Sequence, residues 1–207
     1  MIKLVIFDLW NTLIYKKVNL DTYHKILKKK KIKISRKKFV ETFEKSVQTK
    51  KWKNEKDAYK NLFKNLKIKP TKENVDYIMN IRDEREETVK TYKHVKQMLN
   101  KIKKQNYKIG IISNISIFSA NRVKKHTTFL KYVDYPLFSY LAGTVKPDKK
   151  IYKKMLKKAK LKPEQTLMIG DNYQNDFKTP KKLGMKAIHY KNYPQLKKDL
   201  KKLGINI

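Results

Sequence analysis

Three polar residues stand at the ends of short apolar segments, and their side chains are of kinds that can do chemistry. They are Asp8, Ser113 and, one residue after Gly170, Asp171. A carboxylate that ends a buried apolar segment is costly unless it is paired or bound to a metal ion. A carboxylate can also attack phosphorus and form a covalent intermediate. Asp8 and Asp171 are therefore candidates for phosphate and metal chemistry.

The apolar segments that precede these residues are expected to be strands of one sheet. They are short and rich in Val and Ile, which is typical of buried strands. The expected strands are 2–7, 108–112, 165–169 and 185–189, with shorter ones near 132–133 and 137–138.

Amphipathic helices are expected between the strands, because apolar residues recur there at helical spacing. The expected helices are 94–104, 149–158, 176–183 and 194–203. This alternation predicts an α/β fold with a Rossmann-like parallel sheet covered on both faces. Ligands bind at the carboxyl ends of the strands in such sheets, so Asp8, Ser113 and Asp171 should lie along one edge.

The segment 15–90 is expected to form a helical cap domain inserted into the α/β core, which would consist of 1–14 and 91–207. Ser35 and Thr71 are candidate helix N-caps within it. Its helical patterns lie near 21–30, 36–49, 55–66 and 72–89. The segment is too long for an ordinary crossover between two strands. A cap of this kind closes on the substrate and excludes water.

Four segments of the chain together resemble the motifs of the haloacid dehalogenase superfamily. Their order and spacing match those of the family across nearly the whole chain. The segments are Asp8-Leu9-Trp10-Asn11-Thr12, Ser113-Asn114, Lys146-Pro147-Asp148 and Gly170-Asp171-Asn172-Tyr173-Gln174-Asn175-Asp176. The resemblance implies a Rossmann-like core, an inserted cap and a hydrolase whose nucleophile is Asp8.

The resemblance also implies a magnesium-dependent phosphohydrolase that acts on a small phosphorylated metabolite through an aspartyl phosphate on Asp8. The Mg²⁺ cofactor would be held by Asp8, Asp171 and the backbone carbonyl of Trp10, because hard oxygen ligands suit this cation. The residues expected to bind the substrate phosphate are Ser113, Asn114 and Lys146.

Two further residues of the motifs have supporting roles in this interpretation. Thr12 would hydrogen-bond near Asp8 and fix its rotamer. Asp176 would orient Lys146 or a metal-bound water, and is a further candidate metal ligand. Thr12 and Asp176 could instead simply cap the helices that they precede.

Trp10 departs from the phosphatase pattern, which has at this position an aspartate that acts as general acid and base. Indole has no proton that titrates at neutral pH, so it can neither protonate a leaving alkoxide nor activate water. Metal and phosphate binding should survive, while turnover would be slow, would require a good leaving group, or would use a base from the cap. His24 in the expected cap is a candidate base.

Two alternative functions stay open. The dehalogenase branch of the family also has an aromatic residue at the position of Trp10, so a 2-haloacid dehalogenase is the second hypothesis. That branch uses no metal, and Asp171 and Asp176 near Asp8 would repel one another without a cation, which favours the phosphatase. The third hypothesis is a weakly active protein that binds phosphate or nucleic acid.

The composition limits the possible partners. The formal net charge is +35, and of the 53 basic residues all are Lys except Arg36, Arg82, Arg85 and Arg122. Specific nucleic-acid readers rely on Arg, so we expect non-specific attraction to polyanions and to anionic substrates. The absence of cysteine excludes disulfides and thiolate chemistry. No long apolar segment or signal-peptide pattern is visible, so we expect a cytoplasmic protein without a membrane partner.

Overall fold

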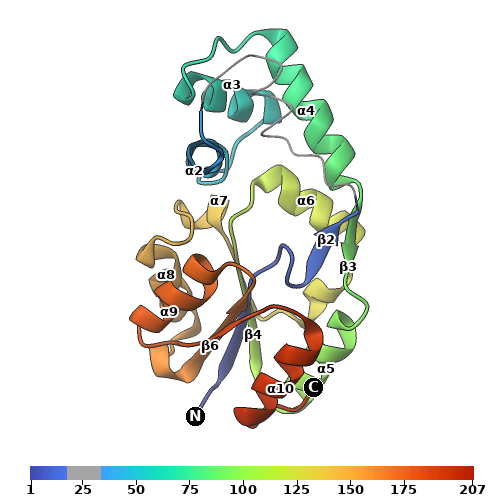
Figure 1. Ribbon diagram of the computed structural model, residues 1–207, viewed down its shortest axis with the longest axis vertical. Coiled ribbons are helices and arrows are strands. Elements are labelled where there is room, and N and C mark those ends of the chain that lie inside the picture. The colour runs from blue at the N-terminus through green and yellow to red at the C-terminus, as the bar shows by residue number, and fades with distance from the viewer. Residues whose placement is uncertain (18–33) are drawn as a thin grey trace.

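A computed structural model of the protein describes residues 1–17 and 34–207. The expected helix near 21–30 and the candidate base His24 lie outside these described residues. The described chain forms an α/β core with a smaller helical body next to it, and both chain ends lie at the far end of the core (Figure 1).

A five-stranded sheet forms the centre of the core, and all of its strands are parallel. Their order is β5-β4-β1-β6-β7. The strands are β1 (Leu4–Phe7), β4 (Lys108–Ser113), β5 (Tyr135–Phe138), β6 (Thr166–Gly170) and β7 (Lys186–His189). Phe7 pairs with Ile111 on one side and with Ile169 on the other. The residues that follow these strands therefore emerge together at one edge, and the predicted parallel α/β fold is confirmed.

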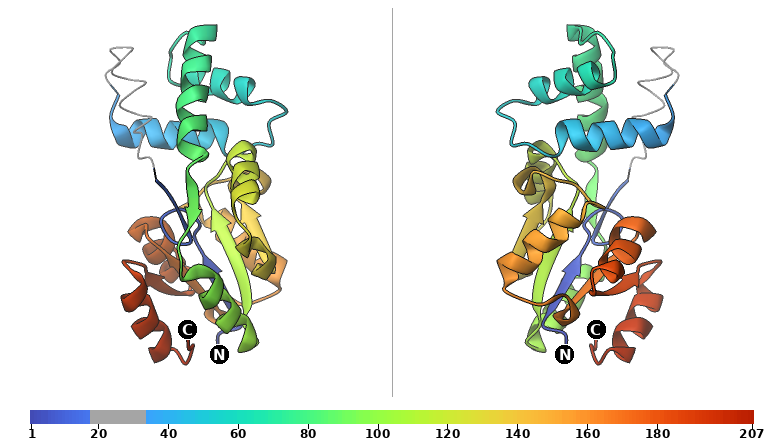
Figure 2. Two further views of the ribbon diagram at one scale, coloured as in Figure 1. Left: turned by 90° about the vertical axis from the view of Figure 1, so that its right-hand side faces the viewer. Right: turned by 90° about the vertical axis from the view of Figure 1, so that its left-hand side faces the viewer.

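Helices cover both faces of this sheet (Figure 2). Side chains alternate along β1, so that Val5 and Phe7 pack with α5, α6 and α10, while Leu4 and Ile6 pack with α8. The helices of the core are α5 (Val95–Lys104), α6 (Ile117–His126), α7 (Ser139–Ala142), α8 (Lys149–Ala159), α9 (Thr179–Lys182) and α10 (Tyr193–Lys202). Burying one such apolar side chain stabilises the fold by roughly 1.5–3 kcal/mol.

The described part of the inserted cap contains three helices, which confirms the expected helical insertion. They are α2 (Arg36–Val47), α3 (Glu55–Asn65) and α4 (Lys72–Glu86). Ser35 and Thr71 are N-caps as expected, because each side-chain oxygen accepts from a backbone amide three residues later. The apolar faces of the three helices form a cluster of their own that includes Phe43, and Phe118 of α6 packs against it. The cap is thus in contact with the core.

Two short antiparallel strands connect the cap with the core, and the sequence did not predict them. They are β2 (Ile14–Lys16) and β3 (Val89–Thr91). Lys16 pairs with Val89, so the outgoing and returning segments run side by side. The helix expected over 72–89 is therefore too long: α4 ends at Glu86 and Val89 is buried in β3 instead.

Other expectations for single elements were wrong. The segment 132–133 is not a strand, because a turn of 3₁₀ helix (Phe129–Tyr132) buries Phe129 there and the strand is β5. The helix expected over 176–183 is divided into a π-helical turn (Tyr173–Lys178) and α9. A short 3₁₀ turn (Pro163–Gln165) precedes β6. The sequence did not predict α6 or α7. Among the described residues, no helix has the length and apolar character needed to cross a membrane.

Candidate active site

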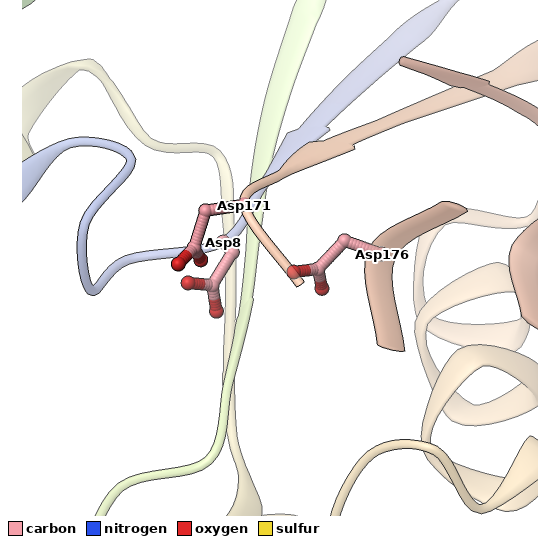
Figure 3. A group of neighbouring side chains, drawn as sticks. All are labelled: Asp8, Asp171 and Asp176. Carbon is pink, nitrogen blue, oxygen red and sulfur yellow. The ribbon is translucent and has the colours of Figure 1, made fainter. Parts of the chain in front are cut away.

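Three aspartates from distant parts of the chain meet at the carboxyl edge of the sheet. Asp8 follows β1, Asp171 follows β6, and Asp176 lies in the π-helical turn. One carboxylate oxygen of each lies within 4.8 Å of those of the other two, and Figure 3 shows the three side chains as one group. Carboxylate oxygens are the ligands that Mg²⁺ prefers. The group could therefore hold a divalent cation.

Lys146 connects two of these aspartates. Its Nζ lies 2.6 Å from Asp8 Oδ1 and 2.6 Å from Asp176 Oδ1, and its side chain is buried. Asn114 holds the backbone of Lys146 on both sides: Asn114 Oδ1 accepts from Lys146 N at 2.7 Å, and Asn114 Nδ2 donates to Lys146 O at 2.9 Å. The Asn114 side chain thus fixes the position of Lys146, a contact that the sequence did not predict.

The ionisation of each of these residues depends on the charges of the others. Burial and the charge of Asp176 raise the pKa of Asp8 to about 7, against the lowering influence of Lys146. Burial also raises the pKa of Asp171, against a hydrogen bond from Asn11 Nδ2 at 3.2 Å. Burial by itself would lower the pKa of Lys146, but Asp176 and Asp8 raise it above its usual value. Three carboxyl groups face one ammonium group, so a divalent cation would relieve the repulsion.

The π-helical turn places Asp176 against the end of β6. A Cβ atom at Gly170 would overlap the Asp176 side chain, so this close approach requires glycine. Asp176 Oδ2 accepts from the backbone amide of Asn172 at 3.1 Å. The N-cap of the turn is Asn172, so the interpretation of Asp176 as a simple helix cap is wrong.

Two hydroxyl groups in the site have no hydrogen-bond partner among the described residues. They are Thr12 Oγ1 and Ser113 Oγ, and both side chains are buried. The bond expected between Thr12 and Asp8 is therefore not formed. Buried hydroxyl groups without a partner are rare, because each costs free energy. A phosphate has acceptor oxygens that could satisfy both groups.

A cavity with a volume of about 630 Å³ lies between the core and the cap. The core lines it with Trp10, Asn11 and Asn114, and strand β2 at the junction of core and cap adds Tyr15 and Lys16. The cap lines it with Arg36, Phe39, Val40, Phe43, Glu44, Gln48, Arg82 and Arg85. Its size is typical of a small-molecule site. The cavity adjoins the aspartates, because Asn11 binds Asp171 and Trp10 is two residues after Asp8.

Glu44 of α2 is a residue of this cavity that the sequence analysis missed. Burial raises its pKa, against a hydrogen bond with Asn114 and the charge of Lys146. Glu44 therefore lies close to the group of aspartates although it belongs to the cap. The sequence holds one sign of it, since Glu44 follows Phe43 on the apolar stripe of an otherwise lysine-rich helix.

A family model described as haloacid dehalogenase-like hydrolase matches residues 2–184 of this chain. The match includes every residue that the sequence analysis placed in the site. It extends over most of the core and all of the expected cap.

Similar proteins of known sequence or structure agree with this family. A glyceraldehyde 3-phosphate phosphatase of Pyrococcus furiosus is 32% identical over 46% of this chain and 40% of its own length. Pyrophosphatase PpaX of Bacillus mycoides is 31% identical over 44% of this chain and 42% of its own length. This chain therefore spans less than half of the length of each of these two relatives. A HAD family enzyme of Bacteroides thetaiotaomicron, solved with magnesium and inorganic phosphate, has 20% identity, a TM-score of 0.64 and coverage of 95% of this chain and 99% of its own. That likeness shows the fold.

Proposed function

Because the chain belongs to the haloacid dehalogenase-like hydrolases, we propose that it is a magnesium-dependent phosphohydrolase acting on a small phosphorylated substrate. The observation that carries this proposal is the group of Asp8, Asp171 and Asp176, joined by Lys146. Such a concentration of buried carboxyl groups is unfavourable without a cation. Relatives named as phosphatases support the same function.

The proposed reaction has two steps at Asp8. A carboxylate oxygen of Asp8 attacks the phosphorus of the substrate, and the bond to the leaving oxygen breaks, which gives an aspartyl phosphate. The leaving oxygen takes up a proton. Water then attacks phosphorus and gives up a proton, so inorganic phosphate is released and the Asp8 carboxylate is restored.

The residues present fit a divalent cation. Asp8, Asp171 and the backbone carbonyl of Trp10 would hold it, with Asp176 adjacent. Their donors are all oxygen atoms, and two of the carboxyl groups have raised pKa values. Bound Mg²⁺ would neutralise the repulsion between the Asp8 carboxylate and the phosphate.

The substrate phosphate would lie between Asp8 and Lys146. The unpartnered hydroxyl of Ser113 would donate to a phosphate oxygen, and the backbone amide of Asn114 would add a second donor. Lys146 supplies the positive charge, held in position by Asn114 and Asp176. Thr12 would offer its unpartnered hydroxyl as a further donor.

Glu44 is the residue that we assign to proton transfer in place of Trp10. It carries the one carboxyl group among the described residues that line the cavity. In its protonated form it would protonate the leaving oxygen, and the resulting carboxylate would accept the proton of the attacking water. Charged and polar groups that face it are Lys146 and Asn114 of the core and Glu41 of its own helix, with Lys16, Arg36, Arg82 and Arg85 along the cavity.

The division into domains follows from the same proposal. The core would comprise 1–14 and 91–207 and carry the nucleophile, and the cap would comprise 15–90 and carry Glu44. The antiparallel pair of β2 and β3 lies at the proposed boundary. Cap closure would bring Glu44 to the substrate and exclude water.

A 2-haloacid dehalogenase is the second candidate, because the aromatic Trp10 lines the cavity where a phosphatase has an acid. Hydrolysis of phosphate esters and of 2-haloacids, each measured with and without Mg²⁺, separates the two. We expect phosphate release that depends on Mg²⁺ and is lost in Asp8→Asn. Halide release without metal would overturn the proposal.

A further inference from the structure

Part of the cavity lining is strongly basic. Among the described residues that line the cavity, Lys16, Arg36, Arg82 and Arg85 are cationic and Glu44 is acidic; these four cations are called the basic wall. Lys16 belongs to β2, at the junction with the core, and Arg82 and Arg85 belong to α4 of the cap. Segments far apart in the sequence thus place positive charge on one cavity.

Lys16 is held inside this wall rather than in solvent. Its side chain is 12% exposed, and its Nζ lies 3.9 Å from Glu86 Oε1 and 3.9 Å from the centroid of the Trp10 ring. Burial and the neighbouring charges of Arg82 and Arg85 lower its pKa, against the influence of Glu86. A lysine that is buried beside like charges is unfavourable by itself, and a bound anion would relieve this.

The carboxylate that faces these cations is shared. Glu86 accepts from Arg82, lies 3.4 Å from Arg122 Nη1 and lies 3.9 Å from Lys16 Nζ. This one carboxylate therefore contacts three cations, of which Arg122 also pairs with Glu55 and Asp83. Arg82 is buried and its Nε has no partner among the described residues. Within those residues, Glu86 is the carboxylate that Lys16 and Arg82 share.

We propose that Lys16 and Arg82 bind a second anionic group of the substrate, a carboxylate or a phosphate, so that the preferred substrates are small phosphate esters with a negatively charged tail. This inference rests on the proposed function, because the other end of the substrate is the phosphate at Asp8. The Trp10 ring lines the same cavity beside Lys16 and would offer an apolar surface to the linking carbon atoms. The cavity volume is sufficient for a small molecule of this kind.

The test compares three esters that have the same three-carbon chain: propyl phosphate, phosphooxypropanoate and propanediol bisphosphate. We expect kcat/KM to be about tenfold or more higher for at least one of the charged-tail esters than for propyl phosphate, mainly through a lower KM. The more favoured tail shows whether the wall prefers carboxylate or phosphate. Equal kcat/KM for all three esters would overturn the inference.

The Lys16→Met variant tests the assignment, because methionine keeps an apolar chain beside Trp10 and removes the charge. We expect the ratio of kcat/KM for charged-tail ester to that for propyl phosphate to fall toward one. Lys17→Met is the matched control, since Lys17 is the adjacent lysine and is exposed. That control should keep the wild-type ratio. A Lys16→Met ratio equal to that of wild type would contradict the inference.

Binding to the Asp8→Asn variant separates this inference from the proposed function. Calorimetry with the same esters needs no turnover, so it remains informative if no ester is hydrolysed or if Lys16→Met fails to fold. About tenfold tighter binding of a charged-tail ester than of propyl phosphate would support the basic wall as an anion site. Equal affinities would contradict the proposed anion site. An absence of hydrolysis in the wild type would contradict only the proposed phosphohydrolase function.

Discussion

Trp10 changes which residue near Asp8 can supply a proton. Its ring contacts Lys16 as a cation–π partner, so it contributes binding surface and no transferable proton. In the proposed mechanism the proton comes instead from Glu44, which reaches the site from the cap. Substrate binding and cap closure would then have to precede proton transfer. Glu44 would therefore make the chemical step depend on the closed conformation.

Glu44→Gln should lower kcat for an alkyl phosphate by about a hundred- to ten-thousand-fold, the usual contribution of general acid–base catalysis. The loss should be much smaller for nitrophenyl phosphate, because its leaving group needs little protonation. Since the pKa of Glu44 is raised and the acid form is required, kcat/KM of the wild type should fall as pH rises through that pKa. Glu41→Gln, an exposed acid on the same helix, is the control. Equal losses with both substrates would argue against proton transfer by Glu44.

Asp171→Asn should raise the melting temperature of the metal-free protein while removing its response to Mg²⁺. Burial raises the pKa of Asp171, so its ionised form is unfavourable in the folded protein at neutral pH. A gain of about 1 kcal/mol would raise Tm by roughly 2–4 °C in a chain of this size. Wild-type protein should gain about 2.7 kcal/mol at a Mg²⁺ concentration near a hundred times Kd. Calorimetric unfolding measures both effects, with Asp76→Asn in the cap as the control.

Elements that are distant in sequence meet at Glu86, at the end of α4. Its carboxylate accepts from Ser119 Oγ of α6 at 2.9 Å, pairs with Arg122 of α6 and lies near Lys16 of β2. A single buried side chain thus connects the cap, the core and the antiparallel pair between them. This network fixes the cap where it meets the core and also holds one wall of the cavity.

Glu86→Gln should therefore destabilise the protein by about 3–5 kcal/mol, because it leaves buried cations without a partner. Burial alone would raise the pKa of Glu86, but Arg82, Lys16 and other donors lower it below its usual value. The contribution of Glu86 is thus full above the unfolded pKa of about 4.3 and is lost as pH falls through the lower folded pKa. Denaturant unfolding at several pH values measures this, with the exposed Glu84→Gln as control. A difference that persists unchanged into strong acid would contradict the ionic explanation.

At the scale of the whole molecule, the sequence predicted the sheet better than the cap. Buried parallel strands such as Leu4–Phe7 are continuous apolar runs, and the residues after them are fixed in place by the sheet itself. The positions of Asp8 and Asp171 at one edge therefore followed from local patterns alone. The pairing of β2 with β3 did not, because three-residue strands carry almost no periodicity and their pairing depends on the docked cap.

The contacts around the site that were missed have the same cause. Two examples are the contact of Asn114 with the backbone of Lys146 and the position of Glu44 on α2 beside the cavity. Both depend on tertiary placement that residue types do not encode. The π-helical turn at Asp176 is likewise set by its close contact with Gly170. The sequence predicted which residue types would do the chemistry. The supporting contacts and the basic wall could be recognised only in the three-dimensional structure.

The net charge of +35 leads to a prediction for the whole surface. Polynucleotides should bind at low salt without sequence preference, and this binding should weaken steeply as ionic strength rises. Fluorescence anisotropy with two unrelated oligonucleotides at increasing salt measures it. Tight binding at physiological salt with preference for one sequence would instead favour a nucleic-acid-binding function.

The central claim is that Asp8 attacks phosphorus and that water later attacks phosphorus again. Hydrolysis of a phosphorothioate ester made chiral with one isotope of oxygen, in water enriched in another isotope and with Mg²⁺ present, tests it most directly through the configuration of the released thiophosphate. The account predicts retained configuration at phosphorus, because each of the two attacks inverts it. Inverted configuration, as a single direct attack by water would give, would contradict it.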